Sequence, residues 1–257
     1  RAALLFCAME YLRRRNAILG SKPFRLGLWV GGATTPNKRT AALNALGNLE
    51  NDGTAENPFI LLKCPWCGAR FGPNNAAPAR GRRRRNTVEG GIPSVTGYYR
   101  HGAGAAQTVV YRCPDHQCEF GKAPPLGKPR DPLPVAVIDE DLVETPPNLL
   151  IGTVDKFAML AWKPELRRFF GIEKNGQHHD EPPTLVIQDE LHLISGPLGT
   201  MVGAYETVID RLCREHGIGR IVPKVIASTA TISRANEQIA HLYARNSVLL
   251  FPPSGLE

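Results

Sequence analysis

Two adjacent carboxylates, Asp189 and Glu190, directly follow the apolar run 184–188. An apolar run of this length predicts a strand, so both acids are expected at the carboxyl edge of a sheet. One carboxylate at such an edge can hold Mg²⁺ on the phosphates of a nucleotide while the other activates an attacking water. The alternative is an ordinary strand that enters a helix, because a helix N-terminus favours acidic residues.

Two further apolar runs also end in polar residues. Residues 224–232 end in small hydroxyl residues, and residues 149–152 are followed by the polar segment 153–157. The patterns at 201–216 and 234–244 have helical spacing, so short strands alternate with helices along the chain. This alternation predicts an α/β fold, a parallel sheet with helices on both faces.

In their order and spacing these segments resemble the first motor domain of superfamily-two helicases. Residues 189–192 are similar to motif II of the D-E-x-H type, and residues 229–231 are similar to the S-A-T motif III. Residues 153–157 are similar to the T-P-G/D-R/K-aromatic segment. The resemblance covers most of the chain outside a central insertion, and it implies a RecA-like sheet.

The resemblance also implies a role for each matched residue. Asp189 is expected to bind Mg²⁺, and Glu190 to activate or position the lytic water. His192 is expected to couple hydrolysis to movement of the nucleic acid through Thr229 or Thr231. The alternative for His192 is a solvent-facing residue in the first turn of a helix.

A second group of residues is expected to hold one nucleic-acid strand by its phosphates, and therefore without reading its sequence. The group contains Thr153, Lys156 and the glycine pair Gly31 and Gly32. The alternative for the glycine pair is a plain turn, because glycine adopts positive φ angles at little cost.

Residues 28–37 and 191–200 are similar to the helicases of bacterial DISARM antiphage systems. This resemblance implies an ATP-dependent, Mg²⁺-dependent helicase or translocase in antiphage defence. Its expected partners are nucleic acid, with DNA favoured over RNA, and other subunits of the defence system. The pattern G-x-x-x-x-G-K-[ST], which cradles nucleotide phosphates, does not occur in the chain. The resemblance therefore implies a fragment of a longer motor that by itself hydrolyses ATP negligibly.

Four cysteines predict a metal site. Cys64 and Cys67 form a C-x2-C pair, and Cys113 and Cys118 form a C-x4-C pair. Four thiolates suit one tetrahedral Zn²⁺ ion, and the C-P-x-C-G turn aims both of its sulfurs at one point. His116 is an alternative fourth ligand in place of Cys118, although we prefer the set of four cysteines.

The cysteine pairs define a zinc-ribbon-like insertion, residues 63–126, between two parts of the motor domain at 1–62 and 127–257. Residues 98–101 are expected to form a hairpin of this ribbon, with base stacking as the alternative. A basic run in the insertion either clamps nucleic-acid phosphates or forms a solvated loop. Its members are Arg80, Arg82, Arg83, Arg84 and Arg85.

Composition restricts the class of protein. Hydrophobic residues make up 42% of the 257 residues, which allows a sizeable core and excludes wholesale disorder. No apolar stretch approaches the roughly 20 residues that cross a bilayer, and no export signal precedes the cysteines, so we expect a cytoplasmic protein. The net charge of +7 favours an anionic partner.

Three smaller expectations follow from local patterns. Leu4, Leu5, Ala8 and Leu12 recur with helical spacing and predict a helix at the start of the chain. Cys7 and Cys213 lie in helical patterns and are expected in the core. The acids 139–141 are expected at a solvated strand end.

A function of a different class stays open. A zinc-ribbon module that binds nucleic acid or acts as an adaptor, without ATPase activity of its own, would account for the cysteines and the basic run. It would leave the three polar strand edges unexplained.

Overall fold

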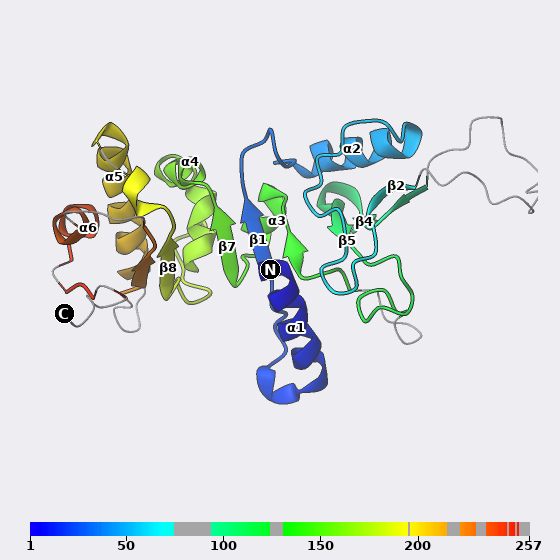
Figure 1. Cartoon of the computed structure of the whole chain (residues 1–257), viewed down its shortest axis with the longest axis horizontal. Coiled ribbons are helices and arrows are strands. Elements are labelled where there is room, and N and C mark those ends of the chain that lie inside the picture. The colour runs from blue at the N-terminus through cyan, green and yellow to red at the C-terminus, as the bar shows by residue number, and fades with distance from the viewer. Residues whose placement is uncertain are drawn as a thin grey trace, which may run out of the picture. The chain divides into compact units, whose positions relative to one another are not determined.

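A computed structural model of the protein places Leu26–Trp29 in β1, the middle strand of a parallel sheet (Figure 1). β1 lies between β6 (Val135–Ala136) and β7 (Leu149–Gly152), and both neighbours run parallel to it. Parallel strands end at a common edge, so the segments that follow β1 and β7 lie together there. The backbone N–H of Thr153, the residue after β7, donates to the carbonyl of Trp29 at 3.3 Å.

The structure describes residues 1–74, 94–123, 131–194, 196–214, 222–229, 235–245, 247–249 and 251. The chain forms two compact units, residues 1–153 and residues 154–257, which we call unit 1 and unit 2. Two predicted groups lie outside the described residues: Thr231, and the basic run Arg80, Arg82, Arg83, Arg84 and Arg85.

Two antiparallel ribbons in unit 1 belong to the predicted insertion. β2 (Gly72–Asn74) pairs with β3 (Ser94–Thr96), and β4 (Tyr98–His101) pairs with β5 (Thr108–Tyr111). The short 3₁₀ helix η2 (Gly104–Ala106) connects β4 to β5. The predicted hairpin at residues 98–101 is therefore confirmed.

Aromatic side chains form the core of these ribbons. Tyr98 and Tyr111 face each other across β4 and β5 with ring centroids 5.7 Å apart. Phe59 lies 4.5 Å from the ring of Tyr98, and Phe71 lies 6.0 Å from it. All four rings are buried, so the hairpin directs its first tyrosine into the core.

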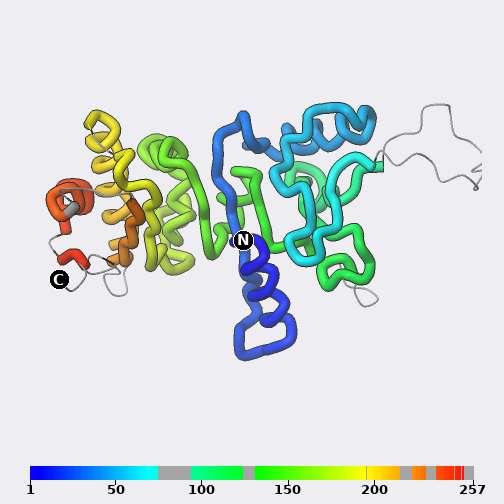
Figure 2. Tube along the Cα trace, viewed as in Figure 1, coloured from blue at the N-terminus to red at the C-terminus, as the bar shows by residue number. Residues whose placement is uncertain are grey.

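Helix α2 (Arg39–Asn51) lies between β1 and the ribbons in sequence. The chain returns from the ribbons to β6 beside β1, and helix α3 (Asp139–Glu144) then connects β6 to β7 (Figure 2). The Glu140 carboxylate accepts the backbone N–H of Arg39 at 2.8 Å. Asp141 accepts Nε of Arg39 at 2.7 Å and the hydroxyl of Thr108 at 2.5 Å. The three acids begin α3, and the expectation of a solvated strand end is wrong for Asp141, which binds partners about 30 and 100 residues away, whereas Glu140 is exposed as expected.

The predicted N-terminal helix is confirmed as α1 (Ala2–Arg15), which is followed by the 3₁₀ helix η1 (Ala17–Leu19). Its buried residues are Phe6, Cys7 and Glu10. The leucines that predicted the helix lie largely in solvent, with 57% of Leu5 and 56% of Leu12 exposed. Helical spacing thus located the helix but did not identify the face that packs.

Unit 2 contains a two-stranded parallel sheet, β8 (Leu185–Gln188) with β9 (Lys224–Ala227). The long helix α5 (Gly196–Arg214) and α6 (Ala235–Tyr243) pack together, which confirms both predicted helices. The unit's shorter helical segments are α4 (Val154–Ala158), η3 (Met159–Ala161), η4 (Pro164–Phe170) and η5 (Leu191–Leu193).

The fold is mixed α/β, with small parallel sheets and a cluster of cysteines. Both strands of the unit 2 sheet expose apolar residues, including 61% of Ile187. These strands differ from the fully buried strands that an uninterrupted apolar run predicts. Among the described helices, none combines the length and apolar character needed to span a membrane.

Candidate metal centre and acidic loop

The first cysteine pair lies on a tight turn in unit 1. The backbone N–H of Cys64 donates to the carbonyl of Ala69 at 2.8 Å, and the N–H of Gly68 donates to the carbonyl of Cys64 at 2.9 Å. Gly68 has a φ of +81°, a left-handed conformation that glycine adopts without steric cost. This turn brings Cys67 back beside Cys64.

The second pair lies on the loop after β5. The N–H of Cys118 donates to the carbonyl of Asp115 at 3.1 Å, and the N–H of Gly121 donates to the carbonyl of Cys118 at 2.9 Å. A Cβ atom at Gly121 would lie only 1.9 Å from the carbonyl oxygen of Asp115. Only glycine therefore permits the close approach of backbone that closes this loop.

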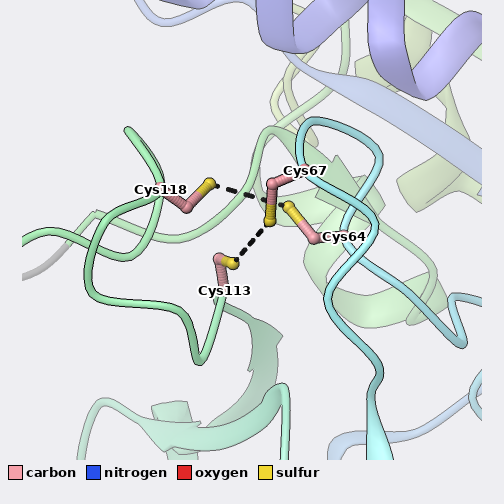
Figure 3. A group of neighbouring side chains, drawn as sticks. All are labelled: Cys64, Cys67, Cys113 and Cys118. Carbon is pink, nitrogen blue, oxygen red and sulfur yellow. Dashed lines mark hydrogen bonds between the residues drawn. The ribbon is translucent and has the colours of Figure 1, made fainter.

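The four sulfurs converge on one point (Figure 3). They lie within 4.8 Å of one another, with 3.4 Å between Cys67 and Cys113 and 4.0 Å between Cys64 and Cys118. Tetrahedral zinc, with Zn–S bonds of about 2.3 Å, requires sulfurs roughly 3.8 Å apart. The cysteines are thus close enough to hold a metal ion such as zinc, and His116 is not a member of the described ligand group.

The charge state of the thiols depends on burial and on backbone amides. Burial opposes ionisation of Cys67, but the amide of Ala69 and the neighbouring cysteines together lower the pKa of its thiol. Burial raises the pKa of Cys118 to about 11, although a hydrogen bond from the backbone amide of Phe120 lowers it in part. Burial also raises the pKa of Cys113. Metal binding must therefore displace protons from at least two of the thiols.

Cys7 and Cys213 do not belong to the metal group. Both are buried, which confirms the prediction that they are core residues. Burial raises the pKa of each thiol to about 12, so both remain protonated at neutral pH.

The predicted catalytic acids lie on a loop of unit 2 between β8 and α5, residues 189–193, which we call the acidic loop. Parallel pairing of β8 with β9 places Gln188 beside Ala227, so the residues that follow these strands are neighbours. The hydroxyl of Ser228 donates to Oδ1 of Asp189, and the N–H of Leu191 donates to the carbonyl of Ser228 at 2.9 Å.

Glu190 has an unusual backbone conformation. Its φ of 54° and ψ of 44° lie in the left-handed region, which costs a residue other than glycine about 1 kcal/mol. Its N–H donates to Oδ1 of Asp189 at 3.0 Å, and its carboxylate lies 3.2 Å from Nδ1 of His192. Asp189 and Glu190 are both exposed, so the strained turn presents two carboxylates to solvent.

The structure thus brings together three residues of the predicted catalytic set, and it adds Ser228, which the sequence did not single out. Thr229 is exposed beside Ser228 at the end of β9. The register of β8 against β9 is the only signal that places Ser228, rather than Thr229, against Asp189.

Gly31 and Gly32 follow β1 at the carboxyl edge of the unit 1 sheet. Neither glycine has a positive φ, so the explanation that they supply such an angle is wrong. The N–H groups of Thr34 and Thr35 both donate to the carbonyl of Gly31. A Cβ at Gly31 would meet no atom within 4 Å, so the compact turn leaves space beside this backbone.

The other predicted phosphate contacts belong to different units. Thr153 ends unit 1 and lies at the same sheet edge as the glycine pair. Lys156 belongs to α4 of unit 2 and is only 4% exposed.

A cavity of about 970 Å³ adjoins the acidic loop within unit 2 and is lined in part by His192, Glu206, Tyr243 and Arg245. Burial raises the pKa of Glu206 to about 7, and the charge of Arg245 partly opposes this shift. The buried hydroxyl of Tyr243 has no hydrogen-bond partner among the described residues.

Comparison with known proteins gives one informative match. The chain matches no family model. Its whole length aligns with the DISARM protein DrmA of Bacillus paralicheniformis (strain ATCC 9945a / NCIMB 11709 / CD-2), with 31% identity over 288 aligned positions. The chain spans 23% of the length of that protein. It is therefore homologous to about a quarter of a DISARM protein.

Proposed function

We propose that the chain is part of an ATP-dependent nucleic-acid helicase or translocase that acts in bacterial antiphage defence. Homology to the DISARM protein DrmA supports the role in defence. The acidic loop carries the enzymatic part of the proposal, because its two exposed carboxylates are oriented by neighbouring groups. A RecA-like motor domain, interrupted by a zinc ribbon, is the architecture that this proposal requires.

Three residues of the acidic loop have a task in the proposed hydrolysis. Asp189 would hold Mg²⁺, which neutralises charge on the phosphates. The hydroxyl of Ser228 and the N–H of Glu190 orient the Asp189 carboxylate toward one geometry. Glu190 accepts a proton from the attacking water, and the imidazole of His192, 3.2 Å away, orients Glu190.

ATP binding also needs a phosphate cradle, which the chain does not encode as a G-x-x-x-x-G-K-[ST] pattern. We therefore assign the activity to a longer protein of which this chain is one segment. Thr229 and Thr231 are proposed to transmit the state of the acidic loop to the nucleic acid.

The proposed nucleic-acid contacts are phosphate contacts, and we favour DNA as the partner. The space beside Gly31 supports close approach of a phosphate backbone there, whereas at Gly32 the side chain of Asn37 lies 2.9 Å from the position of an added Cβ. Thr153 lies at the same edge. Lys156 is buried, so its proposed contact with a phosphate rests on the resemblance alone. Arg82, Arg83, Arg84 and Arg85 are proposed as a phosphate clamp, which predicts binding that weakens as salt is added.

We propose zinc as the metal of the four-cysteine group, with Cys64, Cys67, Cys113 and Cys118 as its ligands. The sulfur spacing and the all-thiolate donor set both favour it. Zinc here supplies structure, because all four ligand positions are occupied by protein.

Glu190→Gln in the full-length protein tests the enzymatic proposal. We expect nucleic-acid-stimulated ATP hydrolysis to fall by roughly a hundredfold or more, while binding of ATP persists. Glu181→Gln is the matched control, because Glu181 is an exposed acid of unit 2 outside the acidic loop. ATPase activity that survives Glu190→Gln undiminished would falsify the assignment of Glu190.

The four-cysteine group also favours a second candidate, a zinc-ribbon module that binds nucleic acid or acts as an adaptor without ATPase activity. The two candidates differ in their response to nucleotide. Nucleic-acid affinity of the full-length protein that does not change with ATP favours the module. Strand-displacement and triplex-displacement assays then separate unwinding from translocation.

A further inference from the structure

The face of α1 that packs in unit 1 contacts the two cysteine loops. The ring of Tyr11 stacks on Trp66, with centroids 5.2 Å apart and an angle of 26° between planes. Trp66 lies between the two cysteines of the first loop, and it meets Phe120 edge-on at 5.6 Å. A chain of three aromatic rings therefore joins α1 to both loops.

Charged side chains of α1 extend these contacts. The Arg14 guanidinium lies over the ring of Phe120 at 5.2 Å from its centroid. Arg15 pairs with Glu119 at 2.8 Å and also covers the ring of Tyr11 at 3.6 Å. These residues and Cys7 recur at the spacing of one helical face. Cys7 shares a hydrophobic cluster with three of the four metal-group cysteines.

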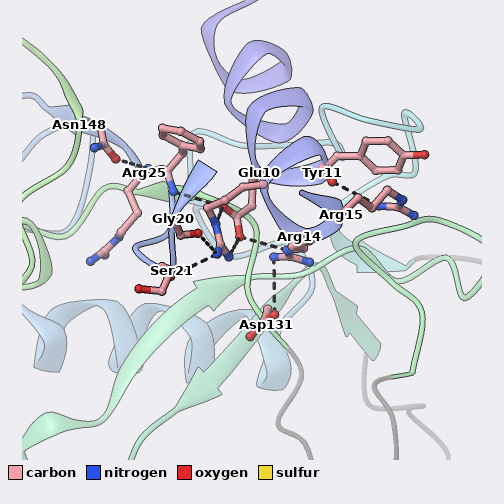
Figure 4. A network of polar contacts seen from close by, with 11 residues as sticks. Glu10, Tyr11, Arg14, Arg15, Gly20, Ser21, Arg25, Asp131 and Asn148 are labelled. Carbon is pink, nitrogen blue, oxygen red and sulfur yellow. Dashed lines mark hydrogen bonds and ion pairs between the residues drawn. The ribbon is translucent and has the colours of Figure 1, made fainter. Parts of the chain in front are cut away.

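A second anchor holds the same helix to the start of the sheet (Figure 4). Glu10 is only 2% exposed. Its carboxylate accepts hydrogen bonds from Nε of Arg13 at 2.8 Å and from Nε of Arg14 at 3.0 Å. It also accepts the backbone N–H of Phe24 at 3.2 Å, two residues before β1 begins. This carboxylate thus connects α1 to the strand that leads to Gly31 and Gly32.

Trp66 and Phe120 are close in sequence to the cysteines of the metal group. Trp66 lies between Cys64 and Cys67 in the sequence, and Phe120 lies two residues after Cys118. The two loops come from sequence segments about 50 residues apart, and an ion bound by cysteines of both loops would join them directly. Without the ion, side-chain packing such as the contact of Trp66 with Phe120 would still join the two loops, and the aromatic surface that receives Tyr11 and Arg14 would be held less firmly.

We propose that the metal ion of the four-cysteine group latches α1 to unit 1, so that metal occupancy controls the order of α1. This inference rests on the proposed metal binding but not on the proposed ATPase activity. The metal centre then has a task outside the insertion, because it fixes a helix that is anchored through Glu10 to the beginning of β1.

Hydrogen exchange of the 257-residue chain tests the latch, with zinc content measured on the same samples. Removal of zinc by a chelator should accelerate exchange of the α1 amides by roughly tenfold or more. The amides of α5 in unit 2 serve as an internal control and should not change. Stoichiometric zinc together with unchanged α1 exchange after its removal would overturn the latch alone. A chain that binds no zinc would overturn the metal centre as well.

Tyr11→Ala in the zinc-loaded chain separates the latch from general unfolding. This variant removes the ring that stacks on Trp66, so α1 should exchange several-fold faster while one zinc ion per chain is retained. Leu12→Ala is the matched control, because Leu12 lies on the exposed side of α1. Equal exchange in both variants would contradict the latch.

Discussion

The four-cysteine group and the acidic loop differ in how far their side chains are buried. Cys64, Cys113 and Cys118 are buried and Cys67 is exposed, and backbone hydrogen bonds and the close approach at Gly121 close their loops. Asp189 and Glu190 are exposed on a strained turn at the end of a two-stranded sheet. A structural metal site needs ligands that enclose the ion, whereas a hydrolytic site must keep its carboxylates accessible to substrate.

The comparison predicts that the metal centre tolerates substitution far less than the acidic loop. Cys113→Ser should have the largest effect, because each ligand contributes roughly a quarter of a zinc-binding free energy of about 12 kcal/mol. Unit 1 should lose about 3 kcal/mol or more of stability, measured by urea unfolding with zinc present. Cys213→Ala is the control, because Cys213 is buried outside the metal group, and it should leave the zinc content unchanged.

Gly121→Ala should have the next largest effect on unit 1. The added Cβ would lie 1.9 Å from a backbone oxygen, which forces the second cysteine loop to shift. We expect a loss of about 2 kcal/mol in the free energy of unfolding and weaker zinc binding. Gly68→Ala, at a positive φ with open space around it, should cost about 1 kcal/mol. If both variants lost a similar free energy of unfolding, the backbone at Gly121 would not approach the Asp115 carbonyl so closely in solution.

Glu206→Gln tests the electrostatics of unit 2 away from the acidic loop. The pKa of Glu206 is raised to about 7, so the folded state favours the protonated form. As pH rises from about 4.5 to about 7, the carboxyl ionises in the unfolded state while it stays largely protonated in the native state, and unit 2 loses stability. The variant should therefore stabilise the protein by about 1–2 kcal/mol at pH 8 and change little at pH 4, as seen in the melting temperature. An equal shift at both pH values would place the cause elsewhere.

Ser228→Ala should have the smallest effect of the four. It removes one exposed hydrogen bond to Asp189, so the free energy of unfolding should fall by about 1 kcal/mol or less. Thr229→Ala, at the neighbouring exposed residue, should change it less still. If Ser228→Ala lowered the free energy of unfolding by several kcal/mol, the acidic loop would be as sensitive to substitution as the metal centre.

Local patterns predicted the elements of the fold well. The strands at 149–152, 185–188 and 224–227 and helices α1, α5 and α6 occur where the apolar runs and helical spacing place them. The four metal-group cysteines were also predictable, because a C-x2-C turn constrains two sulfurs within a few residues. Short-range sterics and hydrogen bonding decide such features, so they can be read along the chain.

Contacts between distant segments decided the rest. Leu5 and Leu12 predicted a helix, yet the packed side of α1 carries Cys7, Glu10 and Tyr11, because Trp66 and Phe120 lie there. Asp141 became a partner of Arg39, about 100 residues away in sequence.

The sequence by itself determined the kinds of element, the four cysteines that lie close enough to hold a metal ion, and the acids at the strand edge. Only the tertiary structure decided which distant segments pack against one another. The selection of Ser228 to orient Asp189 required the register of β8 against β9, and the buried side of α1 required both cysteine loops in place. The physical reason is that spacing along a chain encodes local backbone geometry, whereas packing depends on which distant side chains are close enough to exclude water.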